Sequence, residues 1–432
     1  MKNRLHFLSK ALKILIPFFA LFISCQNEAP DSKPSPDEIK IKDGYLITID
    51  EAIEFVTSYN NDHSSFRLSE NKMNTKSVSE TKTIKDPSNS DIEMFHIINF
   101  KEGGFKIVSA DARTIPILAE SEDNYIPLEN ISNINGLSYW IEQSINQIRE
   151  IKNSQTTIDP RISKEWSKYL KNLPNDKNLR DTNCLEWYQW GQYLCQSTFT
   201  TIGPLTGLTY GQSGVTSSFL GSGNCTCSKD AAGCGPVAMS QVLTHIGRTH
   251  GNFGIYNFGL QPNTSNYQCN ANTSGEISLA NLTFNAGNAI QSMYNFFGAC
   301  NTMSIPTNGL LNQAMGQMGL SNGGTHSTFN PSTLYNEIYQ NYPVIFYGYD
   351  QNSNIGWANN WHIWMCEGYK KHIYSEFDCE TLGCSVWEYH QAYMNWGWDG
   401  SSNGWYAIGN FSPSGSSYNY TGNLRMAYGF RK

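Results

Sequence analysis

The sequence predicts an α+β protein built from a small first domain and a larger second domain. In the first part, two amphipathic helices enclose a β-hairpin. In the second part, a helix that opens on a turn of small residues is followed by several strands. At 432 residues the chain is too long for one ordinary domain. Composition places a boundary near residue 180, because only Trp140 and Trp166 of the 11 tryptophans precede it.

The first residues predict export. Basic residues that include Lys2 and Arg4 precede an apolar run from Ile14 to Ile23, which is too short to cross a bilayer as a stable helix. The residues that end this run resemble a lipobox, in which Cys25 is acylated and becomes the mature N-terminus. We expect a lipoprotein signal peptide over residues 1–24 and a tether over 25–46, with the protein anchored by lipid at the bacterial outer membrane or cell surface. The alternative is an ordinary signal peptide that happens to contain a cysteine.

Charge argues against nucleic acid as a partner. The net charge is −7 with an isoelectric point near 5.7, and no basic run occurs beyond the N-terminus. Nucleic-acid binding surfaces carry clustered Lys and Arg, which this composition does not provide. Nothing in the sequence implies a metal or an organic cofactor.

The 11 cysteines of an exported chain are expected to form disulfides in part. Cys225 and Cys227 have no matching second pair of ligands, so we expect no zinc site at them. Spacing alone does not determine connectivity. Candidate pairs are Cys379 with Cys384, across a short loop, and Cys184 with Cys195.

The first domain, residues 47–152, begins with a helix. Thr48 and Glu51 form a capping-box pattern, and the apolar residues that follow share one helical face. The runs 93–100 and 105–110 are rich in β-forming residues and are joined by a turn with two glycines, which predicts a hairpin. The members of the two helical faces are Ala52, Ile53, Val56 and Tyr59 in the first helix, and Leu137, Trp140, Ile141, Ile145 and Ile148 in a second one.

A hydrophilic connector over residues 153–183 follows, with a short helix expected around 164–170. We expect the maturation cut to lie in this region. The second domain then covers residues 184–432.

The residues that carry chemistry begin with Cys234. A turn of small residues opens directly into an amphipathic helix, and Pro236 suits its first turn, where no N–H is required. Cys234 therefore lies at the helix N-terminus, where the helix dipole favours the thiolate over a thiol with an ordinary pKa of about 8.5. Taken alone, the segment is also compatible with a buried or disulfide-bonded structural cysteine.

A thiolate nucleophile needs an imidazole that holds a proton and delivers it to the leaving amine. Of the nine histidines, His245 lies about 16 Å along the helix of Cys234 and cannot turn back to it. His362 opens a strand in a series of strands that predicts an antiparallel sheet. Asn395, near the end of a neighbouring strand, can lie beside His362 and orient its ring. A structural role for His362 is the alternative. The strands of this series are expected over residues 343–349, 362–369, 390–396 and 404–408.

Two parts of the chain resemble the streptopain family of papain-like cysteine peptidases. In residues 47–150, the strings Phe100-Lys101-Glu102-Gly103-Gly104-Phe105 and Ile107-Val108-Ser109-Ala110-Asp111 are similar to the propeptide and inhibitor domain. Over residues 204–412 the similar strings are Tyr210-Gly211-Gln212, Gly233-Cys234, Tyr347-Gly348 and Asn395-Trp396-Gly397-Trp398. The resemblance implies a papain-like fold, in which the nucleophile helix packs on an antiparallel sheet.

Carried over residue by residue, the resemblance implies Cys234 as nucleophile and His362 as general base and acid. It implies that the Gln212 side chain and the Cys234 N–H stabilise the oxyanion. Asn395 would orient His362, and Trp396 would shield that contact from water.

Three departures from the family pattern bear on substrate choice. Trp361 stands before the histidine, Tyr210 replaces the usual Trp, and an insertion at 375–388 lengthens the loop before Asn395. None of them removes a reacting group.

The expected function is that of a cysteine endopeptidase made as a zymogen. Its partners would be peptide or protein substrates, its own first domain as inhibitor, and the membrane through the lipid anchor. Two alternatives from other classes remain. One is a non-catalytic surface lipoprotein that binds peptide or glycan through exposed aromatic rings, and the other is a degenerate member that acts only as an inhibitor.

Overall fold

The computed structural model describes residues 43–64, 76–129, 131, 135–171, 173, 193–295, 300, 302–304, 306, 309–349, 361–378, 381–413 and 424–432. The predicted signal peptide, Cys25 and most of the tether lie outside these residues, as do Cys184 and Cys379. Within the described ranges, no helix has the length and apolar character needed to span a membrane.

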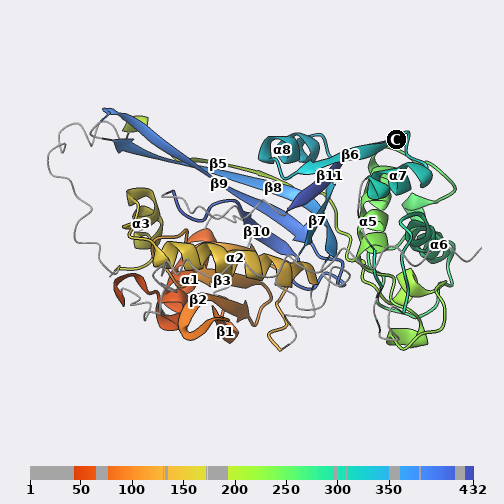
Figure 1. Cartoon of the computed structure of the whole chain (residues 1–432), viewed down its shortest axis with the longest axis horizontal. Coiled ribbons are helices and arrows are strands. Elements are labelled where there is room, and N and C mark those ends of the chain that lie inside the picture. The colour runs from red at the N-terminus through yellow and green to blue at the C-terminus, as the bar shows by residue number, and fades with distance from the viewer. Residues whose placement is uncertain are drawn as a thin grey trace, which may run out of the picture. The chain divides into compact units, whose positions relative to one another are not determined.

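One antiparallel sheet of eleven strands organises the fold (Figure 1). Its order is β1-β2-β3-β4-β10-β9-β8-β7-β11-β6, and β5 pairs with β8. The strands are β1 Val78–Asp86, β2 Asn89–Phe100, β3 Phe105–Ser109, β4 Ile117–Ser121, β5 Thr198–Ile202, β6 Asn322–Thr328, β7 Val344–Tyr349, β8 Trp361–Asp378, β9 Gly383–Asn395, β10 Gly404–Ile408 and β11 Arg425–Arg431. The helices are α1 Ile49–Ser64, α2 Asn135–Asn153, α3 Pro160–Ser167, α5 Cys234–Thr249, α6 Ser274–Ala289, α7 Leu310–Gln317 and α8 Pro331–Tyr339.

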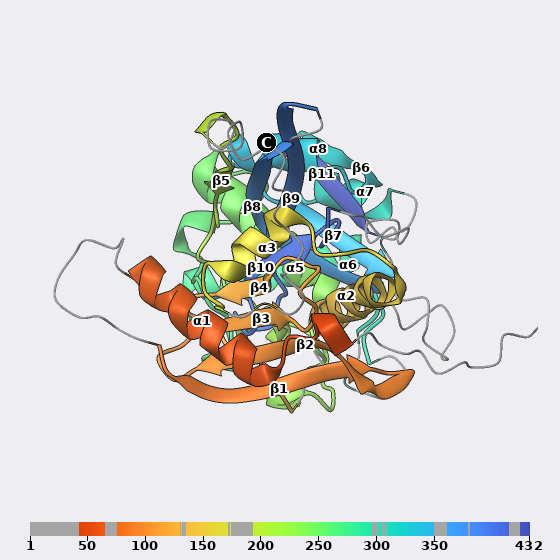
Figure 2. The ribbon, with the colours of Figure 1, turned by 90° about the vertical axis from the view of Figure 1, so that its left-hand side faces the viewer.

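The local signals of the first domain are confirmed. The Glu51 side chain accepts the Thr48 N–H at 2.7 Å and the Thr48 hydroxyl accepts the Glu51 N–H at 3.3 Å, which is the reciprocal capping box that starts α1. α1 contacts β2 and β3 (Figure 2). The hairpin forms with Ile97 opposite Ile107. β1 was not predicted, because most of its residues are at least partly exposed and show no alternation.

The sheet continues from the first domain into the second. β4 pairs with β10 through Glu120 opposite Trp405 and Ala119 opposite Tyr406. One buried apolar cluster contains residues of both parts, from Ile47 to Met426. The two predicted domains are thus joined by backbone hydrogen bonds and by a shared core, although the sequence predicts two units linked by a connector.

The strands after the connector have two buried faces. Ile345 and Ile363 belong to the cluster beneath α5 and α6, while Phe346 and Trp364 belong to the cluster shared with the first domain. This alternation follows from the two-residue period of a strand. It leaves the nucleophile helix on one face of the sheet and α2 on the other.

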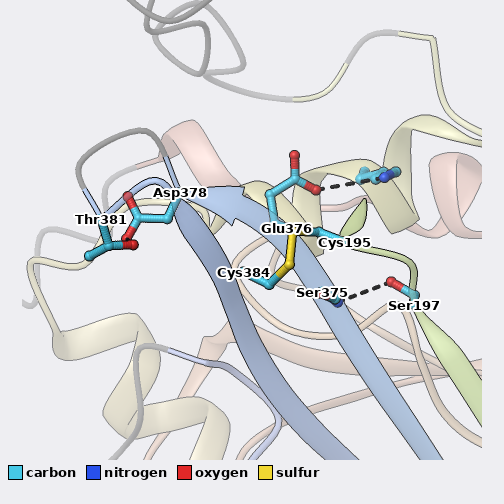
Figure 3. The surroundings of a disulfide bond; sticks show 8 residues. Cys195, Ser197, Ser375, Glu376, Asp378, Thr381 and Cys384 are labelled. Atoms are coloured by element: carbon cyan, nitrogen blue, oxygen red, sulfur yellow. Dashed lines mark hydrogen bonds and ion pairs between the residues drawn. A yellow bond between two sulfur atoms is a disulfide. The ribbon is translucent and has the colours of Figure 1, made fainter. Parts of the chain in front are cut away.

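The disulfides correct the expected pairing. Cys195 and Cys384 bond each other across 189 residues (Figure 3), so the candidate pairs Cys184 with Cys195 and Cys379 with Cys384 are wrong. The sheet register gives the reason, since β5 pairs with β8 and Phe377 of β8 lies opposite Cys384. The remaining described pairs are Cys225 with Cys300 and Cys227 with Cys269.

Candidate active site

Cys234 is the first residue of α5 and is partly exposed. Gly233 precedes it with φ +89°, a conformation that favours glycine. A Cβ at Gly233 would lie 2.6 Å from the Thr302 methyl group, so only glycine fits this close approach. Cys234 is a free thiol, which removes the alternative of a disulfide-bonded cysteine.

The structure brings Cys234 to the strand that carries His362. The backbone N–H of Ile363, the residue after His362, lies close enough to the Cys234 thiol to lower its pKa. A Cβ at Gly235 would lie 3.3 Å from the Ile363 side chain, so the start of α5 is packed tightly on β8. His362 itself is 9% exposed and lies opposite Gly348 of β7. The two predicted reacting residues therefore lie on adjoining backbone.

The charge state of Cys234 differs from the expectation. Burial raises the pKa of the Cys234 thiol, and the N–H groups of Ile363, Gly235 and Cys234 oppose that rise only in part. In this form of the chain the neutral thiol is therefore favoured, although the helix N-terminus predicted a stabilised thiolate.

Gln212 is held close to the nucleophile turn. Its carbonyl accepts the Ala232 N–H at 2.8 Å, two residues before Cys234. The preceding residue, Gly211, donates its N–H to the Ser265 hydroxyl at 2.8 Å. The Gln212 side chain is half-buried. This placement is compatible with the oxyanion role that the sequence predicts.

Asn395 departs from its predicted contact. It is fully buried at the end of β9 and lies opposite Met365, not His362. Its amide nitrogen donates to the Leu208 carbonyl at 2.7 Å and to the Glu367 carboxylate at 3.1 Å. Its amide oxygen accepts from the Gln241 side chain at 2.8 Å and from the Gly397 N–H at 3.4 Å. The amide is used fully by these four bonds, so in this structure it does not orient His362.

Trp396 is buried beside the first domain. Its indole N–H donates to the Ser402 carbonyl at 3.0 Å, and its ring lies 5.3 Å from that of Trp364. A Cβ at Gly136 of α2 would lie 2.4 Å from the Trp396 ring. The ring therefore contacts α2 directly. Trp396 was predicted to shield a contact between His362 and Asn395 from water. The hydrogen bonds of Asn395 do not include that contact.

α2 also reaches the strand next to His362. Gly348 and His362 are register partners and so share one face of the sheet. A Cβ at Gly348 would lie 2.7 Å from the Tyr139 ring of α2. The first domain thus packs against the backbone that carries the candidate base. By the same register, the His362 side chain lies on the face that α2 covers, whereas α5 packs on the opposite face, so Cys234 adjoins the backbone of this strand and the two side chains lie on different faces in this structure.

Two polar residues of this region were not predicted. Glu367 lies within the apolar run of β8, and Gln241 lies seven residues after Cys234 on the same face of α5. An acidic residue in the otherwise apolar run 363–369 of β8 is the signal that would have found Glu367, since a buried charge needs partners.

The three departures from the family pattern, Tyr210, the insertion at 375–388 and Trp361, lie in different parts of the structure. Tyr210 is fully buried and donates its hydroxyl to the Pro262 carbonyl at 2.9 Å. The described residues of the insertion, 375–378 and 381–388, form the far ends of β8 and β9 together with the disulfide of Cys384 (Figure 3). The side chain of Trp361 lies outside the part of the chain that the structure describes.

The described residues contain no group of three His, Cys, Asp or Glu side chains placed to hold a metal ion. Cys225 and Cys227 are both in disulfides.

Comparison with known proteins gives one family match. Residues 46–148 match the family model described as Spi protease inhibitor. No curated protein matches the chain. The first domain is therefore similar to a class of protease-inhibitor domains, and the match covers less than half of the chain.

Two solved structures give the individual likenesses. A fragment of prointerpain A from Prevotella intermedia is 18% identical, with 82% of this chain and 99% of that one covered and a TM-score of 0.47. The active wild-type interpain A cysteine protease of the same organism is 17% identical, with 54% and 96% covered and a TM-score of 0.36.

Proposed function

We propose that the chain is the precursor of a papain-like cysteine endopeptidase of the streptopain type. The observation that carries the proposal is the packing of the free thiol Cys234, at the N-terminus of α5, against the backbone N–H that follows His362. This places the backbone beside a candidate base next to a candidate nucleophile, from segments more than a hundred residues apart in the sequence, and catalysis then requires the His362 side chain to turn to the Cys234 face. The similarity of residues 46–148 to protease inhibitors adds support from the other end of the chain.

The reaction uses the side chains in sequence. The Cys234 thiolate attacks the peptide carbonyl and forms a tetrahedral oxyanion, which the Gln212 side chain and the Cys234 N–H stabilise. The oxyanion collapses, the C–N bond breaks, and protonated His362 gives its proton to the leaving amine. Water then attacks the acyl-enzyme while His362 takes its proton, the C–S bond breaks, and the acid is released with the Cys234 thiolate and protonated His362 restored.

The first domain acts as the inhibitor of the precursor in this proposal. α2 packs on Trp396 through Gly136 and on Gly348 through Tyr139, both next to residues of the candidate site. Cys234 is partly exposed, but desolvation raises the pKa of its thiol, which is in keeping with a latent form.

Maturation requires a cut between the two parts. α3 belongs with the first domain, because Trp166 is fully buried and donates its indole N–H to the Thr114 carbonyl at 2.9 Å. Cys195 is bonded to Cys384 and belongs with the peptidase part. We therefore place the cut after Leu173 and before Cys195 in the sequence. Export, acylation at Cys25 and anchoring at the outer membrane are part of the proposal and rest on the sequence pattern alone.

The non-catalytic alternative receives less support. It needs exposed aromatic rings. The tryptophans Trp140, Trp166, Trp364 and Trp396 are each at most 2% exposed and build the core, whereas the exposed aromatic rings are those of tyrosines and phenylalanines such as Tyr193 and Phe199.

Intact mass tests the proposal. Residues 26–432 of the wild type and of Cys234→Ala are incubated with dithiothreitol and a thiolate-directed epoxide inhibitor. The wild type should lose its first domain and take up one inhibitor at Cys234, and the variant should do neither. Absence of labelling in the wild type, even after an added protease has cut the connector, would refute the catalytic assignment.

A further inference from the structure

Glu367 stands out among the buried groups that the proposed mechanism does not use. It is 1% exposed in the middle of β8. Among the described residues, no cation lies within ion-pairing distance of it, in contrast to Glu120 or Glu337. Burial raises its pKa to about 7, although hydrogen bonds from Thr206 and Asn395 oppose the rise. A carboxyl group kept at such a position lowers stability in its ionised form, so its contacts need an explanation.

The groups around the carboxylate are donors. The Thr206 N–H donates to one oxygen at 2.7 Å, and the Asn395 amide donates to the other at 3.1 Å. The backbone carbonyl of Glu367 accepts the Leu205 N–H at 2.9 Å. A residue with two acceptor oxygens satisfies both side-chain contacts, whereas an amide side chain offers one acceptor and one donor.

These contacts converge on the segment that leads to Gln212. Glu367 holds Leu205 and Thr206, and Asn395 holds the carbonyl of Leu208 at 2.7 Å. The Thr206 hydroxyl accepts the Leu208 N–H at 3.1 Å, which closes a turn inside the segment. Four residues further on stands Gln212.

The same network reaches the nucleophile helix. The Gln241 side chain of α5 donates to the Asn395 amide oxygen at 2.8 Å. The side chains of Gln241, Asn395 and Glu367 are each at most 1% exposed. A chain of buried hydrogen bonds thus runs from α5 through Asn395 to Glu367 and the 205–208 backbone. Buried networks of this kind fix the relative position of the elements that they join.

We propose that Glu367 is a positioning residue, which aligns the segment carrying the oxyanion donor Gln212 with the nucleophile helix through Thr206 and Asn395. The inference rests on the proposed function, in which Gln212 stabilises the oxyanion. Glu367 does not touch the substrate. Its loss displaces the donor and leaves the nucleophile in place.

The test separates steps that use the oxyanion donor from a step that does not. Peptide-amide hydrolysis develops an oxyanion, whereas alkylation of Cys234 by iodoacetamide is a displacement of iodide and develops none. In Glu367→Gln, either the Thr206 N–H or the Asn395 amide must face the NH₂ group of the new side chain, which cannot accept a hydrogen bond. We expect kcat to fall about 10- to 100-fold with KM changed less than about 3-fold, and the Cys234 alkylation rate to stay within about 2-fold of wild type.

A double variant asks whether Glu367 acts through Gln212. If it does, Glu367→Gln combined with Gln212→Ala should be no slower than Gln212→Ala alone, within about 2-fold. Glu337→Gln is the matched control, because Glu337 is another buried carboxylate, 8% exposed and bonded to Arg431. It should leave kcat unchanged. If Glu367→Gln does not accumulate as folded protein, Glu367→Asp keeps both acceptors but withdraws them by one methylene, and the same direction is expected.

The outcomes are distinct. Full wild-type kcat in Glu367→Gln, multiplicative losses in the double variant, or an alkylation rate that falls along with kcat would overturn the positioning role alone. A wild type that shows no Cys234-dependent hydrolysis would overturn the proposed function and this inference with it.

Discussion

Replacement of Glu120 by Gln should destabilise the precursor where its two parts meet. Glu120 of β4 accepts from Lys106 of β3 at 2.6 Å and from Lys370 of β8 at 2.7 Å. Burial opposes ionisation of Glu120, but the two ammonium groups outweigh it and hold its pKa well below the usual range. The carboxylate is therefore charged throughout the neutral range and bridges the first domain to the sheet of the second.

The magnitude follows from what the substitution leaves behind. Loss of one partner of a buried ion pair typically costs about 3–5 kcal/mol, because a buried charge stays uncompensated. Lys106 is 2% exposed but keeps Glu122 at 3.7 Å, and Lys370 lies over the Trp405 ring at 4.5 Å. These remaining contacts compensate in part, so we expect a loss of about 2–4 kcal/mol in the free energy of unfolding.

Urea unfolding of the Cys234→Ala precursor is the assay, since that background prevents self-cleavage. Glu122→Gln is the control: Glu122 is 49% exposed and pairs with Lys76 at 3.1 Å, so its loss should cost less than about 1 kcal/mol. Equal midpoints for Glu120→Gln and Glu122→Gln would refute the reasoning.

Three further predictions use other contacts. Asp86→Asn removes the two bonds from Arg149, at 2.6 and 2.8 Å, and should cost about 1–2 kcal/mol at pH 7 by thermal unfolding. Because those bonds lower the pKa of Asp86 to about 2, the contribution is complete above the unfolded pKa of about 3.9 and is lost as pH falls through about 2, below which variant and wild type should converge. Gly136→Ala places a methyl group on the Trp396 ring and should weaken the packing of the first domain by about 1–3 kcal/mol. In a connector-cut precursor, size-exclusion chromatography should then show faster release of the first domain, and unchanged release would contradict the prediction. Because burial raises the pKa of Cys234, iodoacetamide labelling of the intact precursor should still accelerate above about pH 9, and a plateau below pH 7 would show that the thiolate is already stabilised.

Local signals allowed much of the secondary structure to be predicted. The capping box at Thr48 and Glu51 and the Gly103–Gly104 turn of the hairpin depend on residues close in sequence, so the sequence specifies them directly. The start of α5 at Cys234 follows from the same kind of signal, a turn of small residues with Pro236.

Contacts distant in sequence were not predictable in this way. The β4–β10 pairing and the bond between Cys195 and Cys384 depend on the register of the whole sheet, which spacing does not determine. Three of the four hydrogen-bond partners of Asn395, namely Leu208, Gln241 and Glu367, come from distant segments, and the fourth is the nearby Gly397; the predicted contact with His362 is not among them.

The most direct test of the central claim is the rate of peptide-amide hydrolysis by the connector-cut protein, measured for the wild type beside Cys234→Ala and His362→Ala. We predict that kcat/KM falls at least about 10³-fold in each variant, because each lacks a reacting group. Hydrolysis that survives in Cys234→Ala would contradict the assignment of Cys234 as the nucleophile.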